Sequence, residues 1–574
     1  MTQPPPPPPN QPPQQGGFGP PEQQPSAPSP AQQPGPYSTP QPAQQPQAGY
    51  GYPGRPPGPG YPGQPSGYGY PGQPSGPGYG YPQPGRPPRP QSGTPDRGGR
   101  RINAQAAIII AAVVAIALIV VGGVWYAHSS AGGGKDDTAG SSGGTGGGGD
   151  GKDDGGTQGS EKVPSDTSAR MFLEIPAPAV KDRQVDSVEG SWLTGRVYAK
   201  SGVDEIVGYD SGSGAEKWTL PLSGQTCAGS DQVTSDGIAV VLAEQAERNG
   251  EGEHEPCTEI TAFDVNTGRK LWTRSVTGSG NKLAFGEVSI SGTTVAVGGG
   301  LDGGAAFDLT SGKSLWQPEP GRCEDAGYAG GAQLVAVRRC GGYDGRYEIQ
   351  LLNAETGAVR WKYRLPAGID NAKVISTDPV VVGVDSADVT SSGATDIFSL
   401  DDRGKLLYKI GLEDGRYAHR CEIAQYDGCR GVVVGNGSLY VPTSEHDGSG
   451  DGGRTNEIVA FSLTTGKTTG VRIDAGDDWT IFPVRMDGGN VIAYKEAPYG
   501  KGDRIVSADG ATGEETTLLE LPADESVQDA VSAIGPDRAQ LWYAGGRLFM
   551  SQDLVSKPYS ADEKEYTALG FGAE

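Results

Sequence analysis

Short runs of apolar residues with the length and pattern of strands recur beyond residue 165. The run EITAF, Glu259–Phe263, alternates in the way expected of a strand with one buried face. Other runs of strand length, such as GIAVVLAE and NVIAYKEA, lie between polar segments. No stretch of useful length shows the period of an amphipathic helix. The pattern therefore predicts an all-β region.

A polar turn followed by a large aromatic residue repeats within this region. The segment FDVNTGRKLW, Phe263–Trp272, has close counterparts in YDSGSGAEKW, FDLTSGKSLW and LNAETGAVRW. The polar residue that opens the turn recurs every 44–61 residues. Its seven positions are Asp210, Asp264, Asp308, Asn353, Asp401, Ser462 and Asp509. A period of roughly 40–50 residues is typical of propeller blades, and polar insertions account for the longest gaps.

The repeated segment has a simple physical explanation. Asp264 and Thr267 can accept hydrogen bonds from the amides of the turn, and Gly268 can adopt a positive φ without steric cost. Trp272 then lies on the outgoing strand, where it can fill the wedge between adjacent sheets. The same position holds Trp218, Trp316 and Trp361, which we expect to be blade-docking aromatics, then Tyr408, Gly470 and Thr517.

The repeats predict an eight-bladed β-propeller of four-stranded blades. Seven repeats supply seven outgoing strands, and three further strands, AVSAIG, RAQLWYAGG and RLFMSQ, follow the last one. The isolated segment ARMFLEIPAP at the front resembles an outgoing strand without a blade of its own. We expect it to complete the last blade, because this closes the ring and leaves no open sheet edge.

One apolar run lies far from these repeats. Ala106–Ala127 carries no charge, and its length of ~33 Å as a helix is sufficient to cross a bilayer. Arg97, Arg100 and Arg101 crowd its N-terminal side. The positive-inside rule therefore predicts a single-pass protein of the cell membrane with a cytoplasmic N-terminus and an extracellular C-terminal domain.

Composition divides the chain into four parts. We predict a disordered Pro/Gln/Gly/Tyr-rich tail over 1–103, a transmembrane helix over 104–128, a Gly/Ser/Asp linker over 129–165 and the propeller over 166–574. The formal net charge is −23, although the tail is basic. Such an acidic outer domain is a poor candidate for binding nucleic acid.

The repeat of an acidic residue, two variable residues, Thr-Gly, three variable residues and Trp resembles the PQQ-like repeat of quinoprotein propellers. The resemblance covers about Met171 to Gln552 and implies the fold more strongly than the function. Members of this family include quinone-dependent alcohol dehydrogenases, the non-enzymatic lipoprotein of the outer-membrane barrel assembly machinery, and receptor-kinase ectodomains. The resemblance thus leaves a binding module and a quinone-dependent oxidoreductase as alternatives.

The sequence favours the non-catalytic alternative. The dehydrogenases of the family use a disulfide between adjacent cysteines, and no two cysteines are adjacent here. The four histidines are dispersed, and the G-x-S-x-G and H-E-x-x-H motifs are missing. We therefore predict no catalytic residues, no metal and no cofactor. The expected function is a membrane-tethered binding or scaffold module with protein partners at the cell envelope, whereas any small-molecule ligand stays unknown.

The six cysteines suggest disulfides, because thiols outside the cytoplasm are under oxidising conditions and their number is even. Blades contact only their neighbours, which favours pairing between cysteines close in sequence. The expected pairs are Cys227 with Cys257, Cys323 with Cys340, and Cys421 with Cys429. Without a C-x-x-C pair or a suitably placed histidine, a zinc site is less well supported.

Overall fold

The computed structural model describes residues 160–573 except 182–183, 249–251, 320, 343–344, 387–393, 413–414, 422–424, 450–452, 559 and 561–563. The predicted tail, the predicted transmembrane helix and most of the predicted linker lie outside these residues. In the described part, no helix has the length and apolar character needed to span a membrane.

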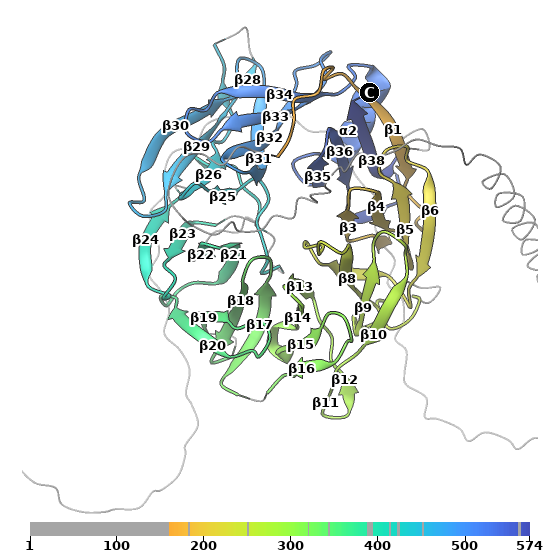
Figure 1. Ribbon diagram of the computed structural model, residues 1–574, viewed down its shortest axis with the longest axis vertical. Helices are drawn as coiled ribbons and strands as arrows, with labels where there is room; N and C mark the ends of the chain where they lie inside the picture. Colours follow the sequence, from red (N-terminus) through yellow and green to blue (C-terminus); the bar gives the residue numbers. More distant parts are fainter. Residues whose placement is uncertain are drawn as a thin grey trace, which may run out of the picture. The chain divides into compact units, whose positions relative to one another are not determined.

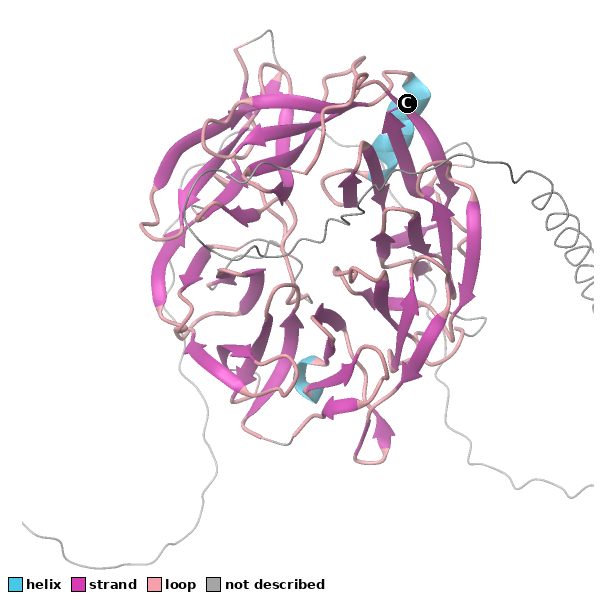
Figure 2. Ribbon diagram, in the orientation of Figure 1, coloured by secondary structure: helices cyan, strands magenta, loops and turns pink. Residues whose placement is uncertain are grey.

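Eight antiparallel sheets of four strands surround a central axis, which confirms the predicted eight-bladed propeller (Figure 1). The strands are coloured separately from the loops in Figure 2. We number the blades along the chain and give the strands of each from the axis outward. Blade 1 consists of β3 (Ser191–Leu193), β4 (Val197–Ser201), β5 (Glu205–Asp210) and β6 (Glu216–Pro221), and blade 2 of β7 (Thr226–Gly229), β8 (Ile238–Ala243), β9 (Glu259–Asp264) and β10 (Lys270–Arg274). Blade 3 consists of β13 (Glu287–Ser291), β14 (Thr294–Gly298), β15 (Gly304–Asp308) and β16 (Ser314–Trp316), and blade 4 of β17 (Cys323–Ala329), β18 (Leu334–Cys340), β19 (Arg346–Leu352) and β20 (Val359–Arg364).

Blades 5–8 repeat this arrangement. Blade 5 consists of β21 (Asn371–Thr377), β22 (Val380–Asp385), β23 (Asp396–Leu400) and β24 (Leu406–Gly411), and blade 6 of β25 (Val433–Gly435), β26 (Ser438–Pro442), β29 (Glu457–Ser462) and β30 (Thr468–Asp474). Blade 7 consists of β31 (Thr480–Asp487), β32 (Asn490–Glu496), β33 (Arg504–Asp509) and β34 (Glu515–Glu520), and blade 8 of β35 (Gln540–Ala544), β36 (Arg547–Ser551), β38 (Tyr566–Ala573) and β1 (Ala169–Pro176).

The first strand of the domain closes the ring, as predicted. β1 pairs antiparallel with β38, with Ala169 opposite Ala573 and Pro176 opposite Tyr566. The prediction for the rest of blade 8 was partly wrong. AVSAIG is no strand but part of helix α2 (Glu525–Ile534), and the third strand is β38, which the sequence analysis did not identify. The helix also contradicts the expectation that amphipathic helices of useful length are missing.

The repeated turns have the expected geometry. In blade 2 the Asp264 carboxylate accepts the N–H of Asn266 at 2.8 Å, and Gly268 has a φ of +68°. Trp218, from the outer strand of blade 1, packs directly on Gly268, since a Cβ added there would lie 2.4 Å from its ring. Each aromatic residue of the repeat therefore covers the turn glycine of the following blade.

The same contact recurs around the ring. Trp272, Trp316, Trp361 and Tyr408 cover the turn glycines Gly312, Gly357, Gly404 and Gly466 in this way. At the closure, Phe172 of β1 packs on Gly214 of blade 1. The apolar core likewise consists of separate clusters between neighbouring blades, and α2 adds Val527, Ala530, Val531 and Ile534 to the cluster between blades 7 and 8.

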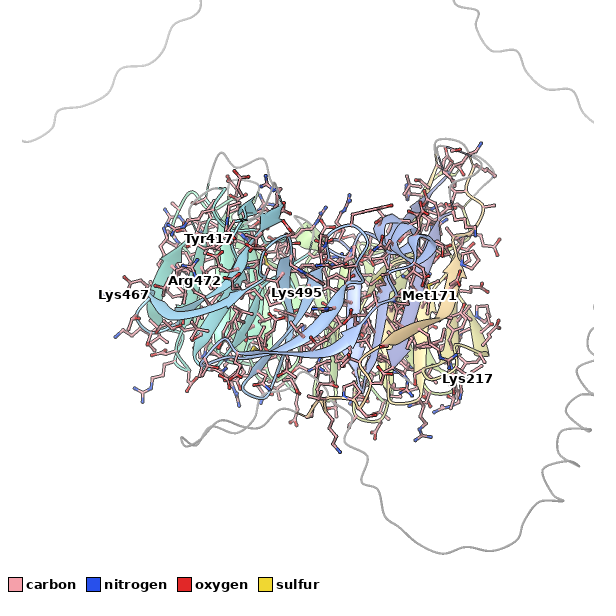
Figure 3. All side chains as sticks on the ribbon, turned by 90° about the horizontal axis from the view of Figure 1, so that it is seen from above. Met171, Lys217, Tyr417, Lys467, Arg472 and Lys495 are labelled. Atoms are coloured by element: carbon pink, nitrogen blue, oxygen red, sulfur yellow. A yellow bond between two sulfur atoms is a disulfide. The ribbon has the colours of Figure 1, made fainter. Side chains whose placement is uncertain are left out.

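The two faces of the ring differ. In blades 1–7, turns join the first strand to the second and the third to the fourth, whereas in blade 8 a turn joins only the first strand to the second, because its third and fourth strands are the last and first strands of the domain. These turns share one face, which we call the turn face. The opposite face, the loop face, carries the second-to-third connections and those between blades. The additional elements lie in these connections: β2 (Val185–Ser187) paired with β37 (Leu554–Ser556), β11 (Thr277–Gly278) with β12 (Asn281–Lys282), β27 (His446–Asp447) with β28 (Arg454–Thr455), η1 (Gly300–Asp302) and α2. Figure 3 shows the ring edge-on, with Tyr417 and Lys217 toward opposite faces.

Candidate functional site at the propeller axis

A loop of blade 6 lies across the axis of the ring. It connects β24 to β25, and we call its described residues 415–421 and 425–432 the axial loop. The disulfide between Cys421 and Cys429 closes it, with a sequence separation of 8. Its backbone is joined to β21 by two hydrogen bonds, from the Gly428 N–H to the Val374 carbonyl and from the Val374 N–H to the Tyr426 carbonyl. The loop is thereby held against the inner strand of blade 5.

Side chains of the axial loop also contact blades on the far side of the axis. The Asp427 carboxylate accepts hydrogen bonds from Gln232 Nε2 at 2.9 Å and Ser289 Oγ at 3.0 Å. Gln425 Nε2 donates to Glu189 Oε1 at 3.3 Å, and Arg430 forms an ion pair with Asp553 at 2.6 Å. The loop therefore links blades 1, 2, 3 and 8 to blades 5 and 6.

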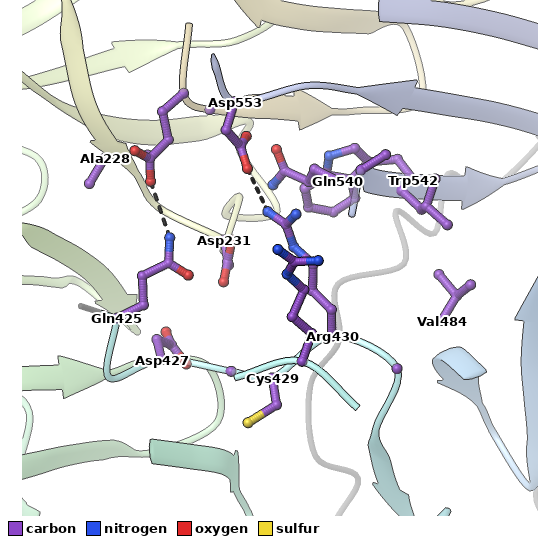
Figure 4. Close-up of a pocket in the computed structure, with 18 of the residues that line it drawn as sticks. Ala228, Asp231, Gln425, Asp427, Cys429, Arg430, Val484, Gln540, Trp542 and Asp553 are labelled. Carbon is purple, nitrogen blue, oxygen red and sulfur yellow. Dashed lines mark hydrogen bonds and ion pairs between the residues drawn. The ribbon is translucent and has the colours of Figure 1, made fainter. Parts of the chain in front are cut away.

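A cavity of about 280 Å³ lies between this loop and the inner strands (Figure 4). Phe482, Val484 and Trp542 contribute apolar surface to its wall. The charged residues of the lining are six carboxylates and two arginines: Glu189, Asp231, Glu287, Asp427, Asp537, Asp553, Arg420 and Arg430. Carboxylates thus predominate in the wall of the cavity.

Burial perturbs several of these carboxylates. It raises the pKa of Glu189 to about 8, and the nearby Asp553 contributes in the same direction. Burial raises the pKa of Asp231 to about 7, with a further contribution from Asp427. Other parts of the chain surround Asp231, but its side chain is exposed to the axial cavity. The pKa of Glu287 is also raised by burial, although the Tyr426 amide and Lys373 oppose the shift.

The resemblance to quinoproteins raises the question of whether this cavity fits the quinone PQQ. PQQ carries three carboxylates, so a site for it requires an excess of cationic and hydrogen-bond donor groups. Here carboxylates outnumber arginines, and Arg430 already pairs with Asp553. The residues present therefore do not fit PQQ. Within the described residues, no group of three or more His, Cys, Asp or Glu side chains is placed to hold a metal ion.

All three predicted disulfides are confirmed. Cys227 pairs with Cys257, Cys323 with Cys340, and Cys421 with Cys429. Cys323 and Cys340 are direct partners across β17 and β18, and Cys227 lies within β7. By the topology of the blades, all three bonds lie on the loop face. Only Cys429 contributes to the wall of the axial cavity, and the docking tryptophans Trp218, Trp272, Trp316 and Trp361 do not line it.

The axial carboxylates were missed by the sequence analysis. Glu189 precedes β3, Asp231 follows β7, Glu287 begins β13, and Asp427 lies in the loop before β25. These positions come from different repeats and share no motif. The one available signal was their position near the ends of predicted inner strands. In a propeller the inner strands of all blades surround the axis, so residues at their ends lie close together.

Comparisons with known proteins agree with the fold. The family model described as outer membrane protein assembly factor BamB matches residues 187–322 and 302–552. None of the curated proteins gives a significant match. Among solved structures, BamB from Moraxella catarrhalis is 13% identical, with a TM-score of 0.37. The alignment covers 69% of this chain and 100% of the BamB chain.

Two further structures are comparably distant. The computationally designed Ika8 protein is 12% identical, with a TM-score of 0.41, over 70% of this chain and 99% of its own. The quinohemoprotein alcohol dehydrogenase ADHIIG from Pseudomonas putida HK5 is 12% identical, with a TM-score of 0.42, over 70% of this chain and 76% of its own. These scores are too low to assign a function. The family match covers well over half of the chain, and the protein therefore belongs to the BamB-like family of PQQ-like β-propellers.

Proposed function

We propose that this chain is a single-pass membrane protein whose extracytoplasmic propeller is a non-catalytic binding module for partner proteins at the cell envelope. The family description, an outer membrane protein assembly factor, is consistent with such a role. The uncharged run Ala106–Ala127 and the arginines before it support the proposed anchor and its orientation.

The difference between the two faces carries the proposal. The insertions, the short hairpins, α2 and the three disulfides lie on the loop face, whereas the turn face has short turns. Disulfides restrict loops that lack a core of their own, and rigid loops lose less entropy when they bind a partner. Exposed apolar side chains on this face include Tyr499, 91% exposed, and Leu554, 58% exposed.

The attachment of the preceding segment supports the same orientation. Ser160 donates to the Asp487 carboxylate through its N–H at 3.0 Å and its Oγ at 2.7 Å. The Glu161 carboxylate accepts the N–H of Gly545 at 3.0 Å. Asp487 and Gly545 lie at turns between first and second strands, so the proposed tether joins the propeller at the turn face. The loop face is thereby left open to partners.

The quinone-dependent oxidoreductase is the less supported alternative. It is suggested by the fold, but the axial cavity carries mainly carboxylates and is crossed by the chain's own loop. A scaffold needs no reacting group at the axis, whereas a quinone enzyme does.

Site-specific photo-crosslinking in native membranes tests the proposal. A photoreactive residue is placed at Tyr499 or Leu554 on the loop face, and at exposed Lys313 on the turn face as a matched control. We expect both loop-face positions to crosslink the same protein and the control to lack that adduct. Absence of a discrete adduct at both loop-face positions, or the same adduct from Lys313, would refute the proposal.

A further inference from the structure

The axial cavity has a deficit of positive charge. Arg430 is engaged with Asp553, and the two nearby lysines are directed to backbone carbonyls. Lys200 Nζ donates to the carbonyls of Val188 and Gly190, and Lys373 Nζ donates to that of Gln425. The wall has six carboxylates, whereas the cations around them are Arg420, Arg430, Lys200 and Lys373, so the negative charge is incompletely compensated.

Two of these carboxylates have oxygen atoms without a hydrogen-bond donor. Glu287 is only 7% exposed, and its Oε2 has no hydrogen-bond partner in the described part of the chain, while its Oε1 accepts the Tyr426 N–H. Asp231 makes no hydrogen bond or ion pair with any described residue, and Figure 4 shows it between the axial loop and the inner strands. Leaving the buried Glu287 oxygen without a donor is costly, whereas Asp231 is exposed and open to a ligand. A bound group with several N–H donors would remove this cost.

The remaining wall suits the apolar part of such a ligand. Trp542 is fixed by a hydrogen bond from its Nε1 to Ser191 Oγ at 2.9 Å. With Phe482 and Val484 it offers a surface for methylene groups, and aromatic rings also attract organic cations. An ammonium group at the end of an alkyl chain has three donors and one positive charge.

We propose that the axial cavity binds an alkylammonium group, next to Asp231 and Glu287, with its alkyl chain against Trp542 and Phe482. The group belongs either to a free polyamine or to a lysine side chain of a bound protein. The polyamine form is independent of the proposed scaffold function, whereas the lysine form rests on it. The charge of the cavity is the opposite of what a quinone tricarboxylate requires.

Binding should depend on pH in a defined direction. The groups that face the site are the carboxylates Glu189, Asp231, Glu287, Asp427, Asp537 and Asp553, together with Arg420 and Arg430. Lys200 acts on Glu189 and Lys373 acts on Glu287 as nearby positive charges. With pKa values of about 7 and about 8, Asp231 and Glu189 carry protons at pH 6.5 and lose them by pH 8.5. A cation competes with these protons, so its affinity rises with pH and its binding releases protons.

Calorimetric titration of the full chain in nanodiscs tests this inference. The probes are spermidine, a peptide with a central lysine, the same peptide with norleucine, and glucose. We expect spermidine or the lysine peptide to bind roughly tenfold more tightly at pH 8.5 than at pH 6.5, with proton release seen as a dependence of the heat on the buffer. The norleucine peptide and glucose should not bind. Preference between spermidine and the lysine peptide identifies the source of the group.

A matched pair of variants localises the site. Asp231→Asn should weaken binding roughly tenfold, the typical effect of losing one ion pair of this kind. Asp236→Asn removes an exposed carboxylate on the turn face and should leave the affinity unchanged. Absence of spermidine and lysine-peptide binding at pH 8.5, binding of glucose with equal affinity, or an unchanged affinity in folded Asp231→Asn would overturn the proposal. Should that variant not fold, absence of proton release by the wild-type chain would do so. The crosslinking partner of the loop face is measured separately.

Discussion

Replacement of Trp272 by alanine tests the packing that joins the blades. Trp272 is only 7% exposed and lies over Gly312 of blade 3, where an added Cβ would approach its ring within 2.8 Å. Its Nε1 donates to the Leu309 carbonyl at 2.7 Å. Its ring also packs near Phe307, with 6.0 Å between ring centroids. The side chain therefore contributes both apolar contact and a hydrogen bond between blades 2 and 3.

The expected effect follows from these contacts. Truncation of a buried tryptophan costs about 3–5 kcal/mol, since it removes apolar contact and leaves a cavity. The unpaired Leu309 carbonyl is one part of this cost. Tyr408 occupies the same position of its repeat but is 42% exposed, so Tyr408→Ala should cost only about 1 kcal/mol. The difference between the two variants isolates burial from position in the repeat.

Urea unfolding followed by circular dichroism and tryptophan fluorescence measures both free energies under non-reducing conditions. Trp272→Ala should lower the free energy of unfolding several times more than Tyr408→Ala. Equal losses, or a loss below about 1 kcal/mol for Trp272→Ala, would show that the aromatic position does not stabilise the interface between blades.

Three further predictions concern the ring, the disulfides and the membrane topology. Deleting Arg170–Pro178 removes the outer strand of blade 8 and should sharply lower the melting temperature; a deletion variant as stable as the parent would contradict closure by β1. Replacing Cys421 and Cys429 together by serine should lower the free energy of unfolding by about 2–3 kcal/mol, measured by urea unfolding, and no loss would show that the bond does not restrict the axial loop. Protease added to intact protoplasts should digest or release the propeller and leave the N-terminal tail protected, and the reverse pattern would refute the proposed orientation.

The repeat made most of the fold predictable, because each blade needs its own turn and its own interblade aromatic residue. Asp264 and Gly268 identify the turn, and Trp272 identifies the outgoing strand. The isolated first strand could be assigned to blade 8 because an open sheet edge is unfavourable. These inferences depended on local chemistry that recurs in every blade.

The errors in blade 8 have local causes. AVSAIG was read as a strand from its apolar residues, but Val527, Ala530, Val531 and Ile534 follow the period of a helix when the preceding residues are included. Gly535 ends the helix in a left-handed conformation, a signal that was present in the sequence. β38 was overlooked because Gly570 and Gly572 interrupt its apolar pattern. They are needed where Leu173 and Phe172 approach closely.

The axial site could not be predicted in this way. Asp231 and Asp427 are separated by 196 positions, and only closure of the ring brings them to one cavity. Spacing of the cysteines gave the pair Cys421 and Cys429, but nothing in the spacing places their loop across the axis. That position depends on contacts with several blades, which no single repeat encodes.

We propose that this propeller acts by binding and has no quinone cofactor. The most direct test of this proposal is a calorimetric titration of the full chain with PQQ in the presence of Ca²⁺, followed by gel filtration and a visible absorption spectrum. We expect no heat of binding and no retained quinone absorbance, because the carboxylates of the axial cavity repel a tricarboxylate. A stoichiometric complex that oxidises an alcohol with an added dye as electron acceptor would contradict it.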